Sequence, residues 1–144
     1  MRKSFGADKV AIFADIHVKH AELLSKMSIT ASAKKAFAKG ADAVIMTCGW
    51  TGVEPDTAKM TKVRKAVGNM PILVGSGADK DNVGKLLGVA NGVIVSTSLK
   101  QGIPKSAERN VMGYEQRISQ KKFQILFMLL GRVSFEYLFG KLSV

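Results

Sequence analysis

The chain has 144 residues, 47% of them hydrophobic, which is enough for one domain with a core and is typical of a globular protein. Twenty-two basic and eleven acidic side chains give a net charge of +11, but no run of five or six like charges occurs. The lysines mostly fall on the outer faces of expected helices, so we interpret them as solvated and expect no nucleic-acid partner. A single cysteine excludes an intramolecular disulfide framework, and no apolar segment follows the basic start, which favours a cytoplasmic protein.

The first expected strand is the apolar run Val10 to Ala14, hydrophobic on both faces as strands of a parallel sheet are. It leads into four ionisable side chains, Asp15, His17, Lys19 and His20. Asp15, His17 and Lys19 alternate, so they would share one side if the strand continued. We interpret the four as a candidate catalytic acid/base set, with a lysine able to form an imine, or as a structural ion-pair cluster. The histidine spacing without a further fixed ligand is a weak metal signal, so we predict neither a metal nor a cofactor.

The segment from Ser28 to Gly40 predicts the first helix, with Ser28 or Thr30 as the N-cap and Gly40 just past the end. The next strand is expected at 42–46 and runs into a turn rich in hydroxyls and glycine. Three residues of this turn are candidate substrate contacts: Thr47, Thr51 and Gly52. We interpret Cys48 as a buried, unreactive thiol, and Trp50 as either covering a ligand or packing against a helix.

Asp56 is the expected N-cap of the second helix, and Gly68 is expected to end it. Met60, Val63 and Val67 share one face of that helix at helical spacing. A third helix is expected after Asp79 or Asp81. Its apolar positions follow the same spacing and are Val83, Leu86, Leu87 and Ala90.

Two further apolar runs each end in a small turn rich in hydrogen-bond donors. Ile72 to Val74 stops at Gly75-Ser76-Gly77, and Val93 to Val95 stops at Ser96-Thr97-Ser98. Barrels of the (β/α)8 type build a phosphate cradle from their last two strand-to-helix loops, because glycine lets the backbone approach an anion and free N–H groups point at it. The phosphate-binding candidates are therefore Gly75, Ser76, Gly77, Ser96, Thr97 and Ser98.

The alternation of strands and helices predicts an α/β fold with a parallel sheet and right-handed crossovers. A complete (β/α)8 barrel needs at least about 200 residues, so this chain is too short to close one alone. We expect a half-barrel domain over residues 1–104 and a helical tail over 105–144. The apolar run Ile125 to Leu130 is far shorter than a bilayer span, and the tail is expected to pack on the barrel edge, on another chain or on a membrane surface.

Four segments resemble the BtpA/SgcQ family of phosphate-binding-type (β/α)8 barrels, in family order: IFADIHVKHA at 12–21, ADAVIMTCGWTG at 41–52, PILVGSGADKDNVGKLL at 71–87 and NGVIVSTSLKQG at 91–102. The resemblance implies that the four strands are the fifth to eighth of a barrel. The sequence departs from the family pattern at Cys48 and Ser96, where the family has glycine, and after Gly102, where the family ending is not recognisable.

In cyanobacteria this family is linked to photosystem I biogenesis, with a peripheral association with membranes. The resemblance therefore implies a biogenesis or assembly factor that keeps an anion site at the barrel mouth. The alternative is an isomerase or lyase acting on a small phosphorylated metabolite, using His17 or Lys19. In either case a half-barrel exposes strand edges and apolar surface, so we expect a homo-oligomer.

Overall fold

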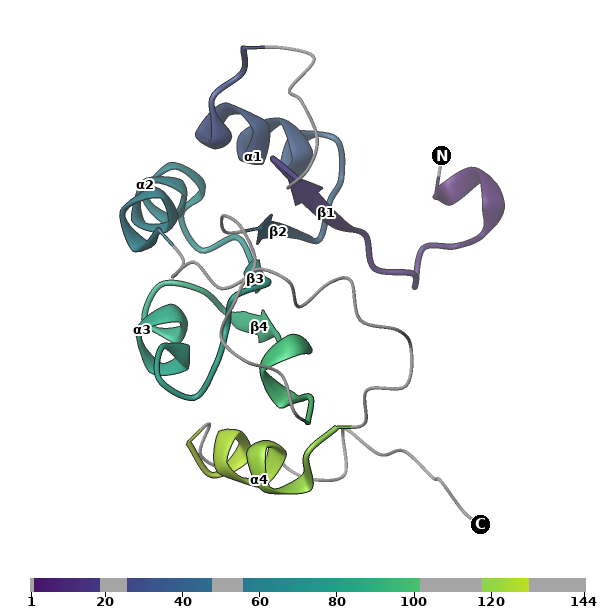
Figure 1. Ribbon diagram of the computed structural model, residues 1–144. Coiled ribbons are helices and arrows are strands. Elements are labelled where there is room, and N and C mark those ends of the chain that lie inside the picture. The colour runs from purple at the N-terminus through teal and green to yellow at the C-terminus, as the bar shows by residue number, and fades with distance from the viewer. Residues whose placement is uncertain (1, 19–25, 48–55, 102–117, 130–144) are drawn as a thin grey trace.

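The computed structural model describes residues 2–18, 26–47, 56–101 and 118–129 (Figure 1). Strands and helices alternate as β1 (Phe13–Ile16), α1 (Ile29–Ala38), β2 (Ala43–Thr47), α2 (Thr57–Val67), β3 (Ile72–Gly75), α3 (Val83–Leu87) and β4 (Gly92–Ile94). Two short 3-10 helices, η1 (Lys3–Phe5) and η2 (Thr97–Leu99), and a further α-helix, α4 (Gln120–Leu129), complete the elements of these residues. The strands form one parallel sheet in the order β1-β2-β3-β4. The predicted α/β class is confirmed, and the sheet is consistent with part of a TIM barrel.

The core lies between one face of the sheet and helices α1, α2 and α3, which stand on the same side of it (Figure 1). Alternate strand residues point toward these helices because side chains alternate across a strand. The buried sheet positions are Ile16, Val44, Met46, Ile72 and Val74, and the helices contribute Ala33, Met60, Val63 and Leu86. Burial of this one face therefore fixes which side chains point to the other.

The opposite face of the sheet carries Phe13, Asp15, Ile45, Leu73 and Ile94. The strand register confirms this arrangement, since Asp15 pairs with Ile45, and Ile45 with Leu73. Phe13 is 55% exposed and Ile94 is 47% exposed. The part of the chain that the structure describes places no helix on this face, which we call the open face.

The first two helices begin and end as predicted. The Ser28 hydroxyl accepts a hydrogen bond from the amide of Ala31 (3.2 Å), and the Asp56 carboxylate accepts one from the amide of Lys59 (3.0 Å). Gly40 (φ +90°) and Gly68 (φ +61°) follow the two helices in conformations that glycine adopts without strain.

Three local predictions were wrong. β1 begins at Phe13 and not at Val10, so Asp15 lies within the strand. Neither Asp79 nor Asp81 is the N-cap of α3, because Asn82 occupies that position. Leu87 is 36% exposed, although Val83, Leu86 and Ala90 are buried as expected, since α3 lasts only five residues and turns one apolar side chain outward.

The N-terminal segment is tied to the start of β2 through Asp42. Its Oδ2 accepts hydrogen bonds from the amide of Ile12 (2.7 Å) and from Nη1 of Arg2 (2.6 Å). Arg2 also donates to the carbonyl of Val10 (2.8 Å). The Ile12 N–H and the Arg2 guanidinium both stabilise the carboxylate and hold the pKa of Asp42 below its ordinary value of 3.8.

This lowered pKa predicts a specific acid sensitivity. A carboxyl group whose pKa is depressed by folding contributes stability that is fully present above the unfolded pKa and is lost as the pH falls through the folded pKa. We therefore expect the free energy of unfolding to fall more steeply below about pH 4 in the wild type than in Asp42→Asn. Arg2→Met should be intermediate, because the Ile12 amide remains. Urea unfolding at a series of pH values measures this, and identical acid slopes in the wild type and Asp42→Asn would contradict it.

Candidate functional site

The candidate residues that the structure describes gather near the carboxyl ends of the four parallel strands. Asp15 lies on β1, Thr47 ends β2 and Gly75 ends β3. Asp15 and Thr47 are joined directly, since the Thr47 hydroxyl donates a hydrogen bond to Asp15 Oδ1 at 2.8 Å. A Cβ built on Gly75 would lie 3.7 Å from Thr47 Oγ1. The Asp15 and Thr47 side chains therefore lie on the open face, and Gly75 leaves space beside them.

His17 does not share that side. β1 ends at Ile16, and His17 adopts φ +53°, which turns the chain away from the extended path. Its Nε2 lies 3.1 Å from the hydroxyl of Ser32 on α1, and the imidazole is half-buried. The structure therefore separates His17 from Asp15, because the alternation assumed in the sequence requires a strand that continues. Lys19 and His20 lie outside the described residues.

Of the predicted substrate contacts, the structure describes Thr47 alone. Thr51 and Gly52 lie outside the described residues, as do Cys48 and Trp50. Within the described segments no group of three or more His, Cys, Asp or Glu side chains is arranged to hold a metal ion.

The two predicted phosphate loops lie side by side. β3 and β4 are paired, with Gly75 opposite Ile94, so their ends emerge next to each other. Beyond the strands, the Ser98 hydroxyl donates a hydrogen bond to the carbonyl of Ala78 at 2.8 Å. This bond links η2 directly to the loop that follows Gly77, and it spans twenty residues of sequence.

The loop after β3 has an unusual backbone. Ser76 (φ +70°) and Gly77 (φ +77°) are consecutive residues in the left-handed region. Glycine adopts this region freely, whereas a serine there is strained. Such strain persists only where the surrounding structure enforces it, and it is often found at ligand-binding loops.

The loop from Gly77 to Asp79 is held by Asn82, a residue that the sequence analysis missed. Its side-chain amide donates to the carbonyl of Gly77 (2.8 Å), and its Oδ1 accepts from the amide of Asp79 (2.9 Å). In return, Asp79 Oδ1 accepts from the amides of Asp81 (2.9 Å) and Asn82 (3.1 Å). Asn82 is only 8% exposed. The signal in the sequence was the Asp-x-x-Asn spacing after a Gly-Ser-Gly turn, because Asp and Asn side chains bond nearby backbone groups in such turns.

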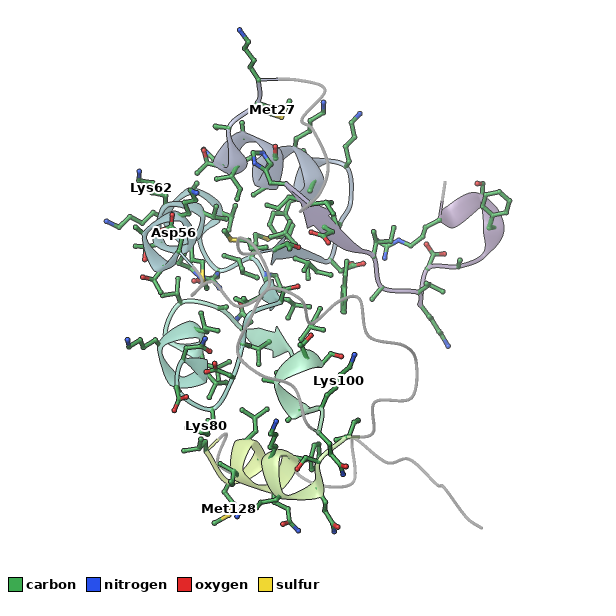
Figure 2. The ribbon with its side chains drawn as sticks, in the orientation of Figure 1. Met27, Asp56, Lys62, Lys80, Lys100 and Met128 are labelled. Carbon is green, nitrogen blue, oxygen red and sulfur yellow. The ribbon has the colours of Figure 1, made fainter. Side chains whose placement is uncertain are left out.

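Four backbone N–H groups of the paired loops have no acceptor in the part of the chain that the structure describes. Among the described residues, no acceptor is bonded to the amide N–H groups of Gly77, Ala78, Thr97 and Ser98. Gly77, Thr97 and Ser98 are half-buried, whereas Ala78 is buried at the edge of the core. Lys100 follows η2 and lies beside it (Figure 2). Free amides, hydroxyls and an adjacent lysine are suited to binding an anion.

Asp15 and the phosphate candidates of the last loop stand at opposite edges of the sheet. β1 and β4 are separated by β2 and β3, so three strand spacings, or about 14 Å, lie between them. Within one chain Asp15 therefore lies closer to the loop after β3, through Thr47, than to the loop after β4.

Residues 1–117 match the model of the BtpA family. The chain is 41% identical over 102 residues to a protein of Synechocystis named photosystem I biogenesis protein BtpA, covering 69% of this chain and 35% of that protein. It is also 38% identical to an uncharacterized protein of Archaeoglobus fulgidus (70% of this chain, 40% of the relative) and 38% identical to an uncharacterized mitochondrial protein of Caenorhabditis elegans (70% and 36%). The chain thus spans a little over a third of the length of these relatives. No solved structure matches it significantly.

Proposed function

Because the chain belongs to the BtpA family, we propose that it acts as a BtpA-like biogenesis factor for a membrane complex of the photosystem I type and that it binds a phosphorylated small molecule at the carboxyl edge of its sheet. The name of the Synechocystis relative supports the first part of this proposal. The geometry of the two loops after β3 and β4 supports the second part.

The observation that carries the anion site is the hydrogen bond from the Ser98 hydroxyl to the Ala78 carbonyl. It holds the loops together and leaves the amides of Gly77, Ala78, Thr97 and Ser98 without acceptors among the described residues. Backbone N–H groups in adjacent loops can bind phosphate without any need for further side chains. The net charge of +11 adds a favourable long-range field for an anionic ligand.

The exposed lysines of the protein also support a peripheral association with a membrane. Helices α1 and α2 carry exposed lysines and no acidic residue within their bounds, and Lys62 points outward from α2 (Figure 2). Lysines on an outer surface are attracted to anionic headgroups. None of the described helices is long and apolar enough to cross a bilayer.

An isomerase or lyase acting on a phosphorylated metabolite is the second candidate. It is favoured by the position of Asp15, whose carboxylate is oriented by Thr47 on the same open face as Gly75. Two strand spacings, about 10 Å, separate β1 from β3, which is compatible with a small sugar phosphate reaching from the anion loops toward the carboxylate. A carboxylate held in this way can accept a proton from such a substrate.

Phosphate titration of the Ser98→Ala variant tests the anion site. We expect inorganic phosphate to bind the wild type and to bind Ser98→Ala about 5-fold to 30-fold more weakly, because losing one hydrogen bond of about 1–2 kcal/mol lets the two loops separate. Calorimetry or NMR titration gives the affinities. Thr61→Ala is the matched control, since it removes a hydroxyl that, among the described residues, bonds the Thr57 carbonyl inside α2 alone.

No phosphate binding by the wild type, or equal affinities for the two variants, would overturn the anion site. The same samples can be incubated with a triose phosphate in D2O. Exchange of a carbon-bound hydrogen that disappears in Asp15→Asn would favour the enzyme over the biogenesis factor.

A further inference from the structure

We propose that two copies of this chain associate through their open faces to close an eight-stranded barrel, in which β4 of one copy pairs with β1 of its partner. The partner then contributes its Asp15 to the anion site of the first copy. For its ligand this inference rests on the proposed function, but the association itself does not.

The arrangement of the sheet makes this closure geometrically available. Four parallel strands stand in sequential order, their helices cover one face, and eight such strands close a barrel. In the described residues β1 and β4 each have one strand neighbour, so each leaves a row of backbone donors and acceptors on its outer side. A two-fold axis along the barrel axis keeps all eight strands parallel, which is the direction that β4 and the partner's β1 need in order to pair.

The β1 end of the sheet carries exposed apolar side chains. Val10, Ile12, Phe13 and Val18 flank or belong to the strand, and each is more than a third exposed. Four such residues around one short strand are uncharacteristic of a solvated edge, where charged side chains or proline usually prevent pairing.

The β4 end of the molecule has a matching set, and Figure 1 shows α4 at the opposite end from β1. Ile94 lies on the open face, and Ile118, Ile125, Met128 and Leu129 belong to α4 or directly precede it. Met128 is 80% exposed and points away from the rest of the molecule (Figure 2). Of the twelve exposed large hydrophobic residues in the described segments, three lie elsewhere: Phe5 on η1, and Met70 and Leu87 between the two ends. The exposed apolar surface is therefore concentrated where the two copies would meet.

The available area is sufficient for a specific dimer. The exposed fractions of the four apolar residues at the β1 end and the five at the β4 end add up to about five fully exposed residues. At roughly 150 Å² for each fully exposed apolar side chain, this is about 750 Å² per copy. Covering them in both copies would bury about 1,500 Å², within the range of stable protein interfaces.

Closure would also bring together groups that one chain keeps apart. Asp15 lies about 14 Å from β4 within its own sheet, but the partner's Asp15 would lie one strand spacing, about 5 Å, from β4. The anion loops after β3 and β4 would then have a carboxylate on each side, one from each copy. A dimer is thus the form in which the predicted phosphate and acid/base candidates share one mouth.

The net charge of +11 per copy opposes association, so salt should strengthen it. Sedimentation equilibrium of the 144-residue chain should show a monomer–dimer equilibrium that shifts toward the dimer as salt is raised. Ile94→Lys, on the open face, should weaken the dimer at least about 10-fold, the effect of about 1.4 kcal/mol. Leu87→Lys is the matched control, because it introduces the same charge at an exposed apolar residue between the two ends.

Cross-linking tests which strands meet. In a Cys48→Ser background, Asp15→Cys and Ser96→Cys lie at opposite edges of one sheet, so a short bismaleimide can join them only between copies. We expect a covalent dimer. A wild type that stays monomeric, equal dimerisation of the two lysine variants, or the absence of a cross-linked dimer would each overturn the proposal. A monomer that still binds phosphate would leave the proposed anion site intact, whereas a dimer that binds none would refute that site alone.

Discussion

Replacing Arg64 by leucine should lower the free energy of unfolding by about 2–3 kcal/mol, because a hydrogen bond to a charged group contributes about 1.5–3 kcal/mol and water can replace the guanidinium at the three more exposed of its four acceptors. It donates to the carbonyls of Val89 (2.9 Å), Gly68 (2.7 Å) and Met70 (2.8 Å) and to Oδ1 of Asn91. These acceptors belong to the turn between α2 and β3 and to the turn between α3 and β4. One side chain therefore holds together the two loops that start β3 and β4.

Lys62→Leu is the control for this prediction. Lys62 lies on the same helix but is exposed and points outward (Figure 2), so its replacement should change stability by no more than about 0.5 kcal/mol. Urea unfolding with an unchanged m-value separates the two effects. Arg64→Lys should recover only part of the loss, because an ammonium group cannot reproduce the planar fork that reaches acceptors on two turns. An Arg64→Leu variant as stable as the wild type would show that water replaces the guanidinium without cost.

Arg64 also illustrates what the sequence could and could not predict. Periodicity assigned the apolar residues Met60 and Val63 to the core, and both are completely buried, because helical spacing alone decides which face of α2 turns inward. The same reasoning placed the basic residues of α2 in solvent. It missed Arg64 because its acceptors are backbone carbonyls on turns that only the folded chain brings together.

The candidate site likewise has features that could be predicted from the sequence and features that could not. The strand ends and the Gly75-Ser76-Gly77 turn could be located from apolar runs and glycine, and the adjacency of the two loops follows from the parallel order of β3 and β4. The separation of His17 from Asp15 could not, since it depends on one residue with a positive φ after Ile16. Asn82 was missed for a related reason, because its role depends on side-chain bonds to a loop whose conformation a linear pattern does not specify.

The loop at Gly77 carries the prediction with the largest expected effect on function. Gly77→Ala should lower the free energy of unfolding by about 1–2 kcal/mol, because a Cβ at φ +77° meets the following carbonyl. If the loop relieves this strain by changing conformation, the Gly77 and Ala78 amides change their orientation, and the Ala78 carbonyl moves away from the Ser98 hydroxyl that bonds it. Phosphate affinity should then fall at least about 10-fold, equivalent to about 1.4 kcal/mol. Chemical unfolding and phosphate titration on the same protein measure both quantities.

Gly84→Ala provides a control with the opposite expected sign. Gly84 lies in α3, is exposed, and has no atom within 4 Å of the position its Cβ would take. Alanine is favoured over glycine inside a helix, so this variant should gain about 0.5–1 kcal/mol of stability and bind phosphate as the wild type does. If Gly77→Ala also keeps wild-type affinity, the loop amides are not the phosphate ligands. If both variants lose affinity, the effect arises from a general loosening of the segment between β3 and β4.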